Sequence, residues 1–195
     1  MKRIYFIRHG QSVANINKTH AGWAQMPLTE QGKTDALRAR AILEGMSFDK
    51  VYSSDLIRAI DTQMIALTGV EVERTALLRE INVGKLAMVP FEECERKYGD
   101  AYKEDKKLFN FKPYGGESYE ELCARIREFL SMIEASEYEK VVAFSHGGLI
   151  NTVLDIITGM RQDRTKFLCE NCSVTVIELK DGEWRLKLWN YTGEL

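Results

Sequence analysis

Hydrophobic residues along the chain form short continuous runs that alternate with longer helical repeats. Residues 4–7 and 140–145 are apolar runs rich in β-forming side chains, and residues 51–53 are a weaker run of the same kind. Runs of this length and composition are typical of strands that are covered on both faces in a parallel sheet. The pattern therefore predicts at least three buried, mostly parallel strands.

Between these runs, apolar side chains recur at the spacing of amphipathic helices. The repeats predict helices over residues 30–43, 55–67 and 119–133. The last of these follows Ser118-Tyr119-Glu120-Glu121, a capping box that marks a helix start. Strands that alternate with helices favour βαβ units, so we expect an α/β fold: a three-layer α/β/α sandwich with a mostly parallel central sheet.

Two segments depart from this alternation. Apolar and polar residues alternate over 174–176 and 184–188, on either side of a turn at 180–183, which predicts a hairpin at an antiparallel edge of the sheet. Residues 84–116 have the weakest periodicity and are dense in charged and aromatic side chains. We expect them to form a small, partly helical insertion over the active site, like a lid, within a single domain spanning residues 1–195.

Composition narrows the possible partners. The 195 residues are 45% hydrophobic, enough for one sizeable core, and the net charge of -2 gives no general attraction to nucleic acid or anionic membranes. The apolar run at 4–7 is too short for a signal peptide, and no apolar stretch reaches membrane-spanning length. We therefore expect a cytoplasmic protein without a nucleic-acid or membrane partner; the pattern favours no particular oligomeric state.

The four cysteines, at positions 94, 123, 169 and 172, are too sparse for a disulfide scaffold. The segment Cys169-Glu170-Asn171-Cys172 has the spacing of some redox and zinc motifs. No second Cys or His pair lies nearby to complete a tetrahedral metal site. We interpret these cysteines as ordinary half-buried thiols.

Polar residues follow each of the three apolar runs. The first run ends in Arg8-His9-Gly10, the second is followed by Ser54-Asp55 and then Arg58, and the third ends in Ser145-His146-Gly147-Gly148. Ligands of open α/β sheets bind beyond the carboxyl ends of the strands. If the three strands are parallel neighbours, two arginines and two of the three histidines meet at one edge.

These residue types suit a phosphate group. Arginine presents a planar fork of donors that matches phosphate oxygens, and glycines let backbone N–H groups approach an anion. Ser12 and Asn15 lie on the turn after His9 and could add neutral donors. His20 has no such context, and we expect it at the surface or the rim of a site.

Six ordered motifs resemble those of the histidine phosphatase superfamily, also called the phosphoglycerate mutase-like family. The resemblance covers nearly the whole chain and is strongest at Arg8-His9-Gly10 and Ser145-His146-Gly147-Gly148. The motifs are residues 8–15, 22–32, 51–59, 78–84, 115–118 and 145–148.

The resemblance implies a phosphohistidine mechanism. His9 would be the nucleophile, and Arg8, Arg58 and His146 would surround the equatorial phosphate oxygens, with Ser12, Asn15 and Gly147 as further binding residues. Glu80 would protonate the departing alkoxide and then take a proton from the attacking water. Two arginines and a histidine would carry the charge, so no metal or other cofactor is expected.

The leaving-group side is the least determined part of the site. After residue 84 the family commonly has an aromatic residue or leucine, then Glu or Gln and a glycine, whereas this chain reads Lys85-Leu86-Ala87-Met88. The chain also lacks the longer, arginine-rich insertion of the mutase branch. We therefore expect a phosphomonoester hydrolase for a small phosphorylated metabolite; the alternatives are mutase-type phosphoryl transfer and a catalytically weak phosphate-binding module.

Overall fold

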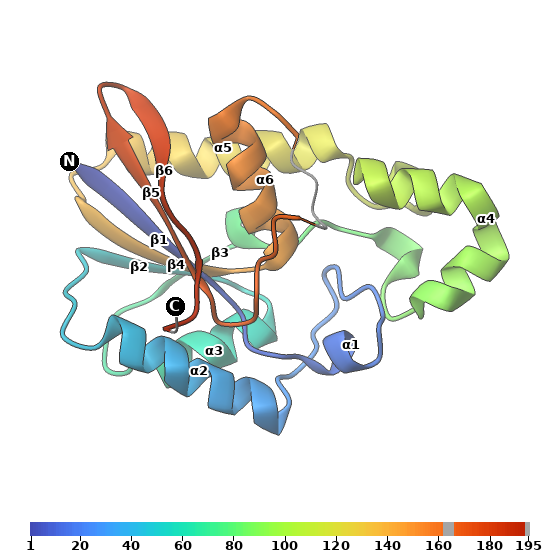
Figure 1. The fold of residues 1–195 in the computed structure, drawn as a ribbon, viewed down its shortest axis with the longest axis horizontal. Helices are drawn as coiled ribbons and strands as arrows, with labels where there is room; N and C mark the ends of the chain where they lie inside the picture. Colours follow the sequence, from blue (N-terminus) through green and yellow to red (C-terminus); the bar gives the residue numbers. More distant parts are fainter. Residues whose placement is uncertain (162–165, 194–195) are drawn as a thin grey trace.

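A computed structural model describes residues 1–161 and 166–193 of the chain. Six strands within these residues form one sheet, in the order β3-β2-β4-β1-β5-β6 (Figure 1). β1 to β4 run parallel to one another, while β5 and β6 form the predicted hairpin, in which β5 is antiparallel to β1. The strands are β1 (Lys2–Arg8), β2 (Lys50–Ser54), β3 (Glu73–Thr75), β4 (Lys140–Ser145), β5 (Val174–Lys180) and β6 (Glu183–Tyr191).

Helices cover both faces of the sheet, which confirms the three-layer α/β/α prediction. The helices α2 (Glu30–Leu43) and α3 (Ile57–Ala66) lie on one face, and α5 (Tyr119–Ala135) and α6 (Gly147–Thr158) lie on the other (Figure 1). Successive side chains of β1 point to opposite faces of the sheet, each of which carries a hydrophobic core. Phe6 packs in the core formed with α5 and α6, and Ile7 packs in the core formed with α2. No helix in the described ranges is long and apolar enough to cross a membrane.

The helix starts follow from local capping. The Glu121 N–H donates to Ser118 Oγ (3.2 Å) and the Ser118 N–H donates to the Glu121 carboxylate (2.9 Å), so α5 begins at the predicted capping box. α3 starts at Ile57, two residues later than predicted, because Leu56 donates its N–H to Ser54 Oγ (3.3 Å) in a turn. Two short elements were not predicted, β3 and the helix α1 (Val13–Ile16).

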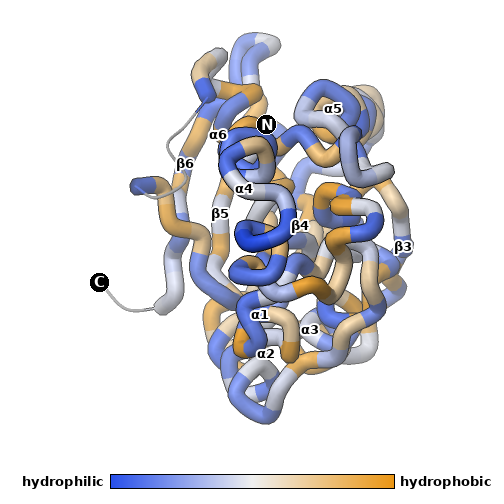
Figure 2. The backbone as a smooth tube through the Cα atoms, turned by 90° about the vertical axis from the view of Figure 1, so that its right-hand side faces the viewer, coloured by the Kyte–Doolittle hydropathy of each residue, from blue (hydrophilic) through white to orange (hydrophobic). Residues whose placement is uncertain are grey.

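Residues 84–116 form a partly helical segment, as expected. They comprise the 3-10 turns η2 (Gly84–Leu86) and η3 (Lys112–Tyr114) and the helix α4 (Phe91–Leu108). α4 is interrupted at Gly99, whose φ of 60° is a conformation that glycine adopts without strain. Figure 1 shows α4 projecting past the end of the sheet, and Figure 2 shows its mostly blue and white trace in front of the strands.

The strand register brings the three polar strand ends together. Arg8 of β1 is paired with Ser145 of β4, and the His9 N–H donates to the Ser145 carbonyl (2.9 Å). On the other side of β4, Ser53 of β2 is paired with Phe144. The carboxyl ends of β1, β2 and β4 are therefore level, as the sequence pattern required. A further 3-10 turn, η1 (Ala76–Leu78), links β3 to the segment that carries Glu80.

Candidate active site

A cavity of about 410 Å³ lies at these strand ends. Its volume is within the usual range for small-molecule sites. Arg8, His9, Arg58 and Glu80 line one part of it, and the segment 84–116 contributes a second, aromatic part. Four of the five predicted catalytic residues thus share one cavity, and the fifth, His146, packs directly against His9 with 5.2 Å between ring centroids.

His9 is held as a neutral imidazole with one free nitrogen. Its Nδ1 lies 2.7 Å from the Gly10 carbonyl oxygen, which can only accept, so Nδ1 carries the proton. Burial, and then the positive charges of Arg58 and Arg8, hold the pKa of His9 well below its ordinary value. Nε2 is therefore an unprotonated nucleophile at neutral pH.

The turn that presents His9 depends on close backbone contacts. A Cβ on Gly10 would lie 2.3 Å from the carbonyl oxygen of Gly32 in the first turn of α2, so position 10 has no room for a side chain. The Gly10 N–H donates to Thr62 Oγ1 (2.9 Å), and Asn171 donates to the His9 carbonyl (2.8 Å). Three separate elements thus fix the orientation of the nucleophile.

Two arginines, of which Arg8 is half-buried, each have one buried donor without a hydrogen-bond partner in the described protein. Arg58 is fully buried, and its terminal nitrogens donate to the carbonyls of Gly22 (2.9 Å) and Ala24 (3.0 Å). Arg8 donates through Nη1 to the Cys169 carbonyl. The Nε atoms of both arginines are buried without a hydrogen-bond partner in the described protein.

Unpaired buried donors are costly, typically about 1–3 kcal/mol each and more on a charged group. Burial lowers the pKa of Arg58 to about 10, against an opposing contribution from Glu80, and the group stays cationic at neutral pH. Two cations with free N–H groups in one cavity are suited to an anion with several acceptor oxygens, such as a phosphate group.

His146 supplies a third unpaired donor. Its Nε2 lies 2.8 Å from Ser54 Oγ, and we assign the hydroxyl proton to this contact, because the hydroxyl group can donate to Nε2 while it accepts the Leu56 N–H. The proton of His146 then lies on Nδ1, which has no partner in the described protein. Burial, together with the charge of Arg58, holds the pKa of His146 well below its ordinary value. His146 is thus a neutral donor.

Glu80 lines the cavity, and its carboxyl group accepts hydrogen bonds from two backbone N–H groups. Its Oε2 accepts from Gly148 (3.0 Å) in the first turn of α6, and its Oε1 accepts from Ile81 (2.9 Å). A Cβ on Gly148 would lie 2.3 Å from Oε1, so this approach requires glycine. The N-terminal end of α6 thereby orients the carboxyl group that the sequence assigned to proton transfer.

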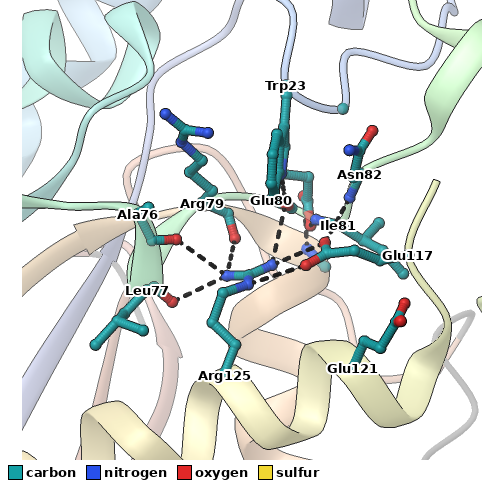
Figure 3. Close-up of polar contacts among 12 residues, drawn as sticks. Trp23, Ala76, Leu77, Arg79, Glu80, Ile81, Asn82, Glu117, Glu121 and Arg125 are labelled. Carbon is teal, nitrogen blue, oxygen red and sulfur yellow. Dashed lines mark hydrogen bonds and ion pairs between the residues drawn. The ribbon is translucent and has the colours of Figure 1, made fainter.

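Arg125 of α5 was missed by the sequence reasoning. Figure 3 shows its guanidinium among the carbonyl groups that precede Glu80. It donates to the carbonyls of Leu77 (2.9 Å), Arg79 (2.8 Å) and Glu80 (3.3 Å). The backbone that carries the Glu80 side chain is therefore bound to α5 by one cationic group.

Glu117 and Trp23 complete this contact. The Glu117 carboxylate receives both Arg125 (3.0 Å) and the Asn82 N–H (2.7 Å), while Trp23 donates its indole N–H to the Glu80 carbonyl (2.7 Å) (Figure 3). The sequence did hold a signal for Arg125: it lies three residues after Leu122 and so occupies the apolar face of α5. A charged residue on such a face is usually paired.

The remaining predicted residues divide into two groups. Asn15 and Gly147 line the cavity, and Gly147 packs beside Arg8, whose Nε would be 3.1 Å from a Cβ at that glycine. Ser12 is fully buried and donates its hydroxyl to Asn15 Oδ1 (3.0 Å), outside the cavity lining. Its hydroxyl thus holds Asn15 at the start of α1, and a direct contact of Ser12 with substrate stays a prediction.

His20, expected at the surface or the rim of a site, lines this cavity. It is half-buried in the cavity wall, with Nε2 2.5 Å from the Tyr102 hydroxyl. All four cysteines are buried and free, which agrees with their interpretation as thiols without a bridge. Within residues 1–161 and 166–193, no cluster of three or more His, Cys, Asp or Glu side chains is placed to hold a metal ion.

The fold is α/β, and its cavity brings His9, Arg8, Arg58 and Glu80 together at the carboxyl ends of the strands. The model of the histidine phosphatase superfamily (branch 1) matches residues 4–192, and the chain belongs to this superfamily.

Relatives within the superfamily are named for different activities. A 2,3-bisphosphoglycerate-dependent phosphoglycerate mutase of Xanthobacter autotrophicus is 32% identical over 77% of this chain and 78% of its own length. An adenosylcobalamin/alpha-ribazole phosphatase of Salmonella typhimurium is 28% identical over 96% of both chains. The solved structure of a mycobacterial glucosyl-3-phosphoglycerate phosphatase in complex with VO3 has a TM-score of 0.87 and 28% identity, covering 98% of this chain and 100% of its own. The predicted family, the histidine phosphatase superfamily, is confirmed.

Proposed function

We propose that the protein hydrolyses a phosphomonoester through a phosphohistidine on His9. The observation that carries this proposal is the neutral His9 ring, with its unprotonated Nε2, beside the unpaired Nε–H groups of Arg8 and Arg58. A nucleophile and an oxyanion site within one cavity are the two requirements of in-line phosphoryl transfer.

In the first step, Arg8, Arg58 and His146 bind the phosphate oxygens through their free N–H groups. His9 Nε2 attacks phosphorus, the ester P–O bond breaks, and Glu80 gives its proton to the departing alkoxide oxygen. Each of these donors is fixed before substrate arrives, so little reorganisation is needed as charge develops on the phosphoryl oxygens.

In the second step, water attacks the phosphohistidine and the P–N bond breaks. Glu80, now a carboxylate, takes the proton of the attacking water, and inorganic phosphate leaves behind a neutral His9. Asn15 and Gly147, which line the cavity, are assigned to substrate binding, and Ser12 to the orientation of Asn15. Besides the ester and water, the groups that react in these two steps belong to the chain.

Hydrolysis is preferred over mutase activity because of the cavity's charge distribution. The cationic arginines gather beside His9, whereas the wall formed by the segment 84–116 is aromatic and contains one lysine. A mutase that exchanges phosphoryl groups with a bisphosphate must hold a second phosphate as firmly as the first. The mutase relative at 32% identity keeps phosphoryl transfer as the second candidate.

The proposal extends to organisation and location. Residues 1–195 would form a single domain in which residues 84–116 act as a lid over the cavity. A cytoplasmic location without a nucleic-acid partner is supported by four free thiols and a net charge of -2.

The test is phosphate release from p-nitrophenyl phosphate in the presence of EDTA. We expect turnover by the wild type and by Arg127→Met, an exposed control, and none by His9→Ala. Brief incubation with a ³²P-labelled ester should leave acid-labile label on the wild type and none on His9→Ala. Activity that survives His9→Ala, or that EDTA removes, would contradict the mechanism; isomerisation of 3-phosphoglycerate with a bisphosphate primer would favour the mutase.

A further inference from the structure

Lys106 of α4 lines the aromatic part of the cavity without an acidic partner. Its neighbours on the same helix are paired: Lys103 Nζ lies 3.0 Å from Asp100, and Lys107 Nζ lies 3.8 Å from Glu104. Among the residues that the structure describes, no carboxylate lies within ion-pair distance of Lys106 Nζ, which lies instead 4.3 Å from the ring centre of Phe91. Lys106 is also half-buried, whereas Lys103 and Lys107 are exposed.

The surface around Lys106 is made of ring edges and faces. His20 contacts Phe91 and Phe111 at centroid separations of 4.6 and 5.5 Å, and Phe109 packs on Phe111 at 6.1 Å. Burial, and then the charge of Lys106, lower the pKa of His20 to about 4, so this histidine is neutral at neutral pH. The wall is thus lined by aromatic rings that meet edge to face, at interplanar angles of 66° to 72°, with one positive charge among them.

This wall and the arginine site belong to the same cavity but have opposite character. The phosphoryl group is matched by two guanidinium groups and His146. The alcohol half of the ester must therefore lie against the rings and Lys106. A partly desolvated ammonium group favours an anionic partner, and one lysine suits a singly charged carboxylate better than a second phosphate dianion.

We propose that the alcohol half of the substrate is a flat, apolar body that carries a carboxylate, which pairs with Lys106. The inference rests on the proposed function, because it assigns the other half of the same ester. It narrows the substrate class to phosphate esters of hydroxy acids with an aromatic or similarly flat body. Sugar phosphates with only hydroxyl groups would form neither the ion pair with Lys106 nor favourable contacts with the aromatic rings.

Binding of non-hydrolysable phosphonates tests this without turnover. The probes are 4-carboxybenzylphosphonate and its neutral match, 4-carbamoylbenzylphosphonate, with affinities measured by calorimetry at low and high salt. For the wild type we expect the carboxylate to bind about tenfold more tightly at low salt, the worth of one charged hydrogen bond. The advantage should shrink in high salt, because the group at Lys106 is only half-buried.

Variants of the two adjacent lysines separate Lys106 from the general charge of α4. Lys106→Met should remove the tenfold preference, Lys106→Arg should retain it, and Lys107→Met, on the exposed side, should leave it unchanged. Equal wild-type affinity for the two probes, or a preference that survives Lys106→Met, would overturn the assignment. Equal affinity for benzylphosphonate and ethylphosphonate would overturn the flat body.

Three phosphate esters distinguish this inference from the proposed function: those of 4-carboxybenzyl alcohol, 4-carbamoylbenzyl alcohol and benzyl alcohol. Their leaving alcohols are similarly acidic, because the methylene group insulates the reacting oxygen from the ring substituent. Hydrolysis of all three without preference would leave the proposed function standing and refute the role of Lys106. Preferential binding of the carboxylate probe without hydrolysis of any ester would support the role of Lys106 and refute the proposed function.

Discussion

Arg125→Met removes the cation that binds the backbone in front of Glu80. Methionine keeps an unbranched side chain along α5 but none of the N–H groups that reach Leu77, Arg79 and Glu80. The Arg125 side chain is 12% exposed and that of its partner Glu117 is 16% exposed. Both groups are therefore largely shielded from solvent. Loss of the Arg125 guanidinium leaves the Glu117 carboxylate largely buried without its cation.

The expected cost to stability follows from that burial. Removing one partner of a buried ion pair costs about 3–5 kcal/mol, and because both side chains retain some exposure we expect about 3 kcal/mol. Domains of this size are stable by about 5–15 kcal/mol, so the variant should still be folded at 25 °C. Urea unfolding measures the difference directly.

Catalysis provides the readout that a purely structural role would leave unaffected. A general acid contributes about 10²- to 10⁴-fold, and a displaced Glu80 should forfeit at least about tenfold of this. Benzyl phosphate has a poor leaving group that needs the proton, whereas p-nitrophenolate leaves without one. We expect kcat/KM to fall much more for benzyl phosphate than for p-nitrophenyl phosphate.

The control is Arg127→Met, which alters an exposed arginine two positions along the same helix and should change neither stability nor the ratio of the two rates. If the loss of Arg125 lowered kcat/KM equally for both esters, Arg125 would contribute to stability but not to proton donation by Glu80. The reasoning would also be wrong if the urea midpoint of Arg125→Met matched that of the wild type.

Two further variants test individual contacts. Gly148→Ala places a Cβ 2.3 Å from Glu80 Oε1, so we expect kcat/KM for benzyl phosphate to fall by about tenfold or more with a similar thermal midpoint; unchanged kinetics would show that Glu80 is not held there. His20 has a folded pKa of about 4 against an ordinary 6.5, so the unfolded chain takes up its proton first as pH falls. The unfolding free energy should therefore drop from pH 7 to pH 5 by about 2 kcal/mol more in the wild type than in His20→Gln; parallel urea titrations would contradict this.

Local patterns in the sequence predicted most of the framework. The helix over 30–43 and the strand over 140–145 have the expected bounds, because each is decided by its own periodicity and its own caps. β3 was missed because three polar residues at a sheet edge carry no alternation. The start of α3 was misjudged because a turn held by Ser54 competes with the helix.

The site was predicted at the level of residue types and strand ends, but its internal geometry was not. Nothing near Glu80 in the sequence indicates that Gly148 and Arg125 will orient it, because both contacts join segments that lie far apart in the chain. Ser12 shows the converse: its position in the motif suggested a ligand donor, while its hydroxyl satisfies the neighbouring Asn15. Side-chain direction is decided by such competition among partners.

The place of β1 in the sheet has a consequence for biosynthesis. β1 is made first, yet its two neighbours, β4 and β5, lie more than a hundred residues later. At the usual rate of about 5–20 residues per second, the nascent strand waits several seconds or longer with its apolar run unpaired. His9 is thus synthesised long before the residues that complete its pocket, and during that interval the apolar side chains of β1 have no partner strand.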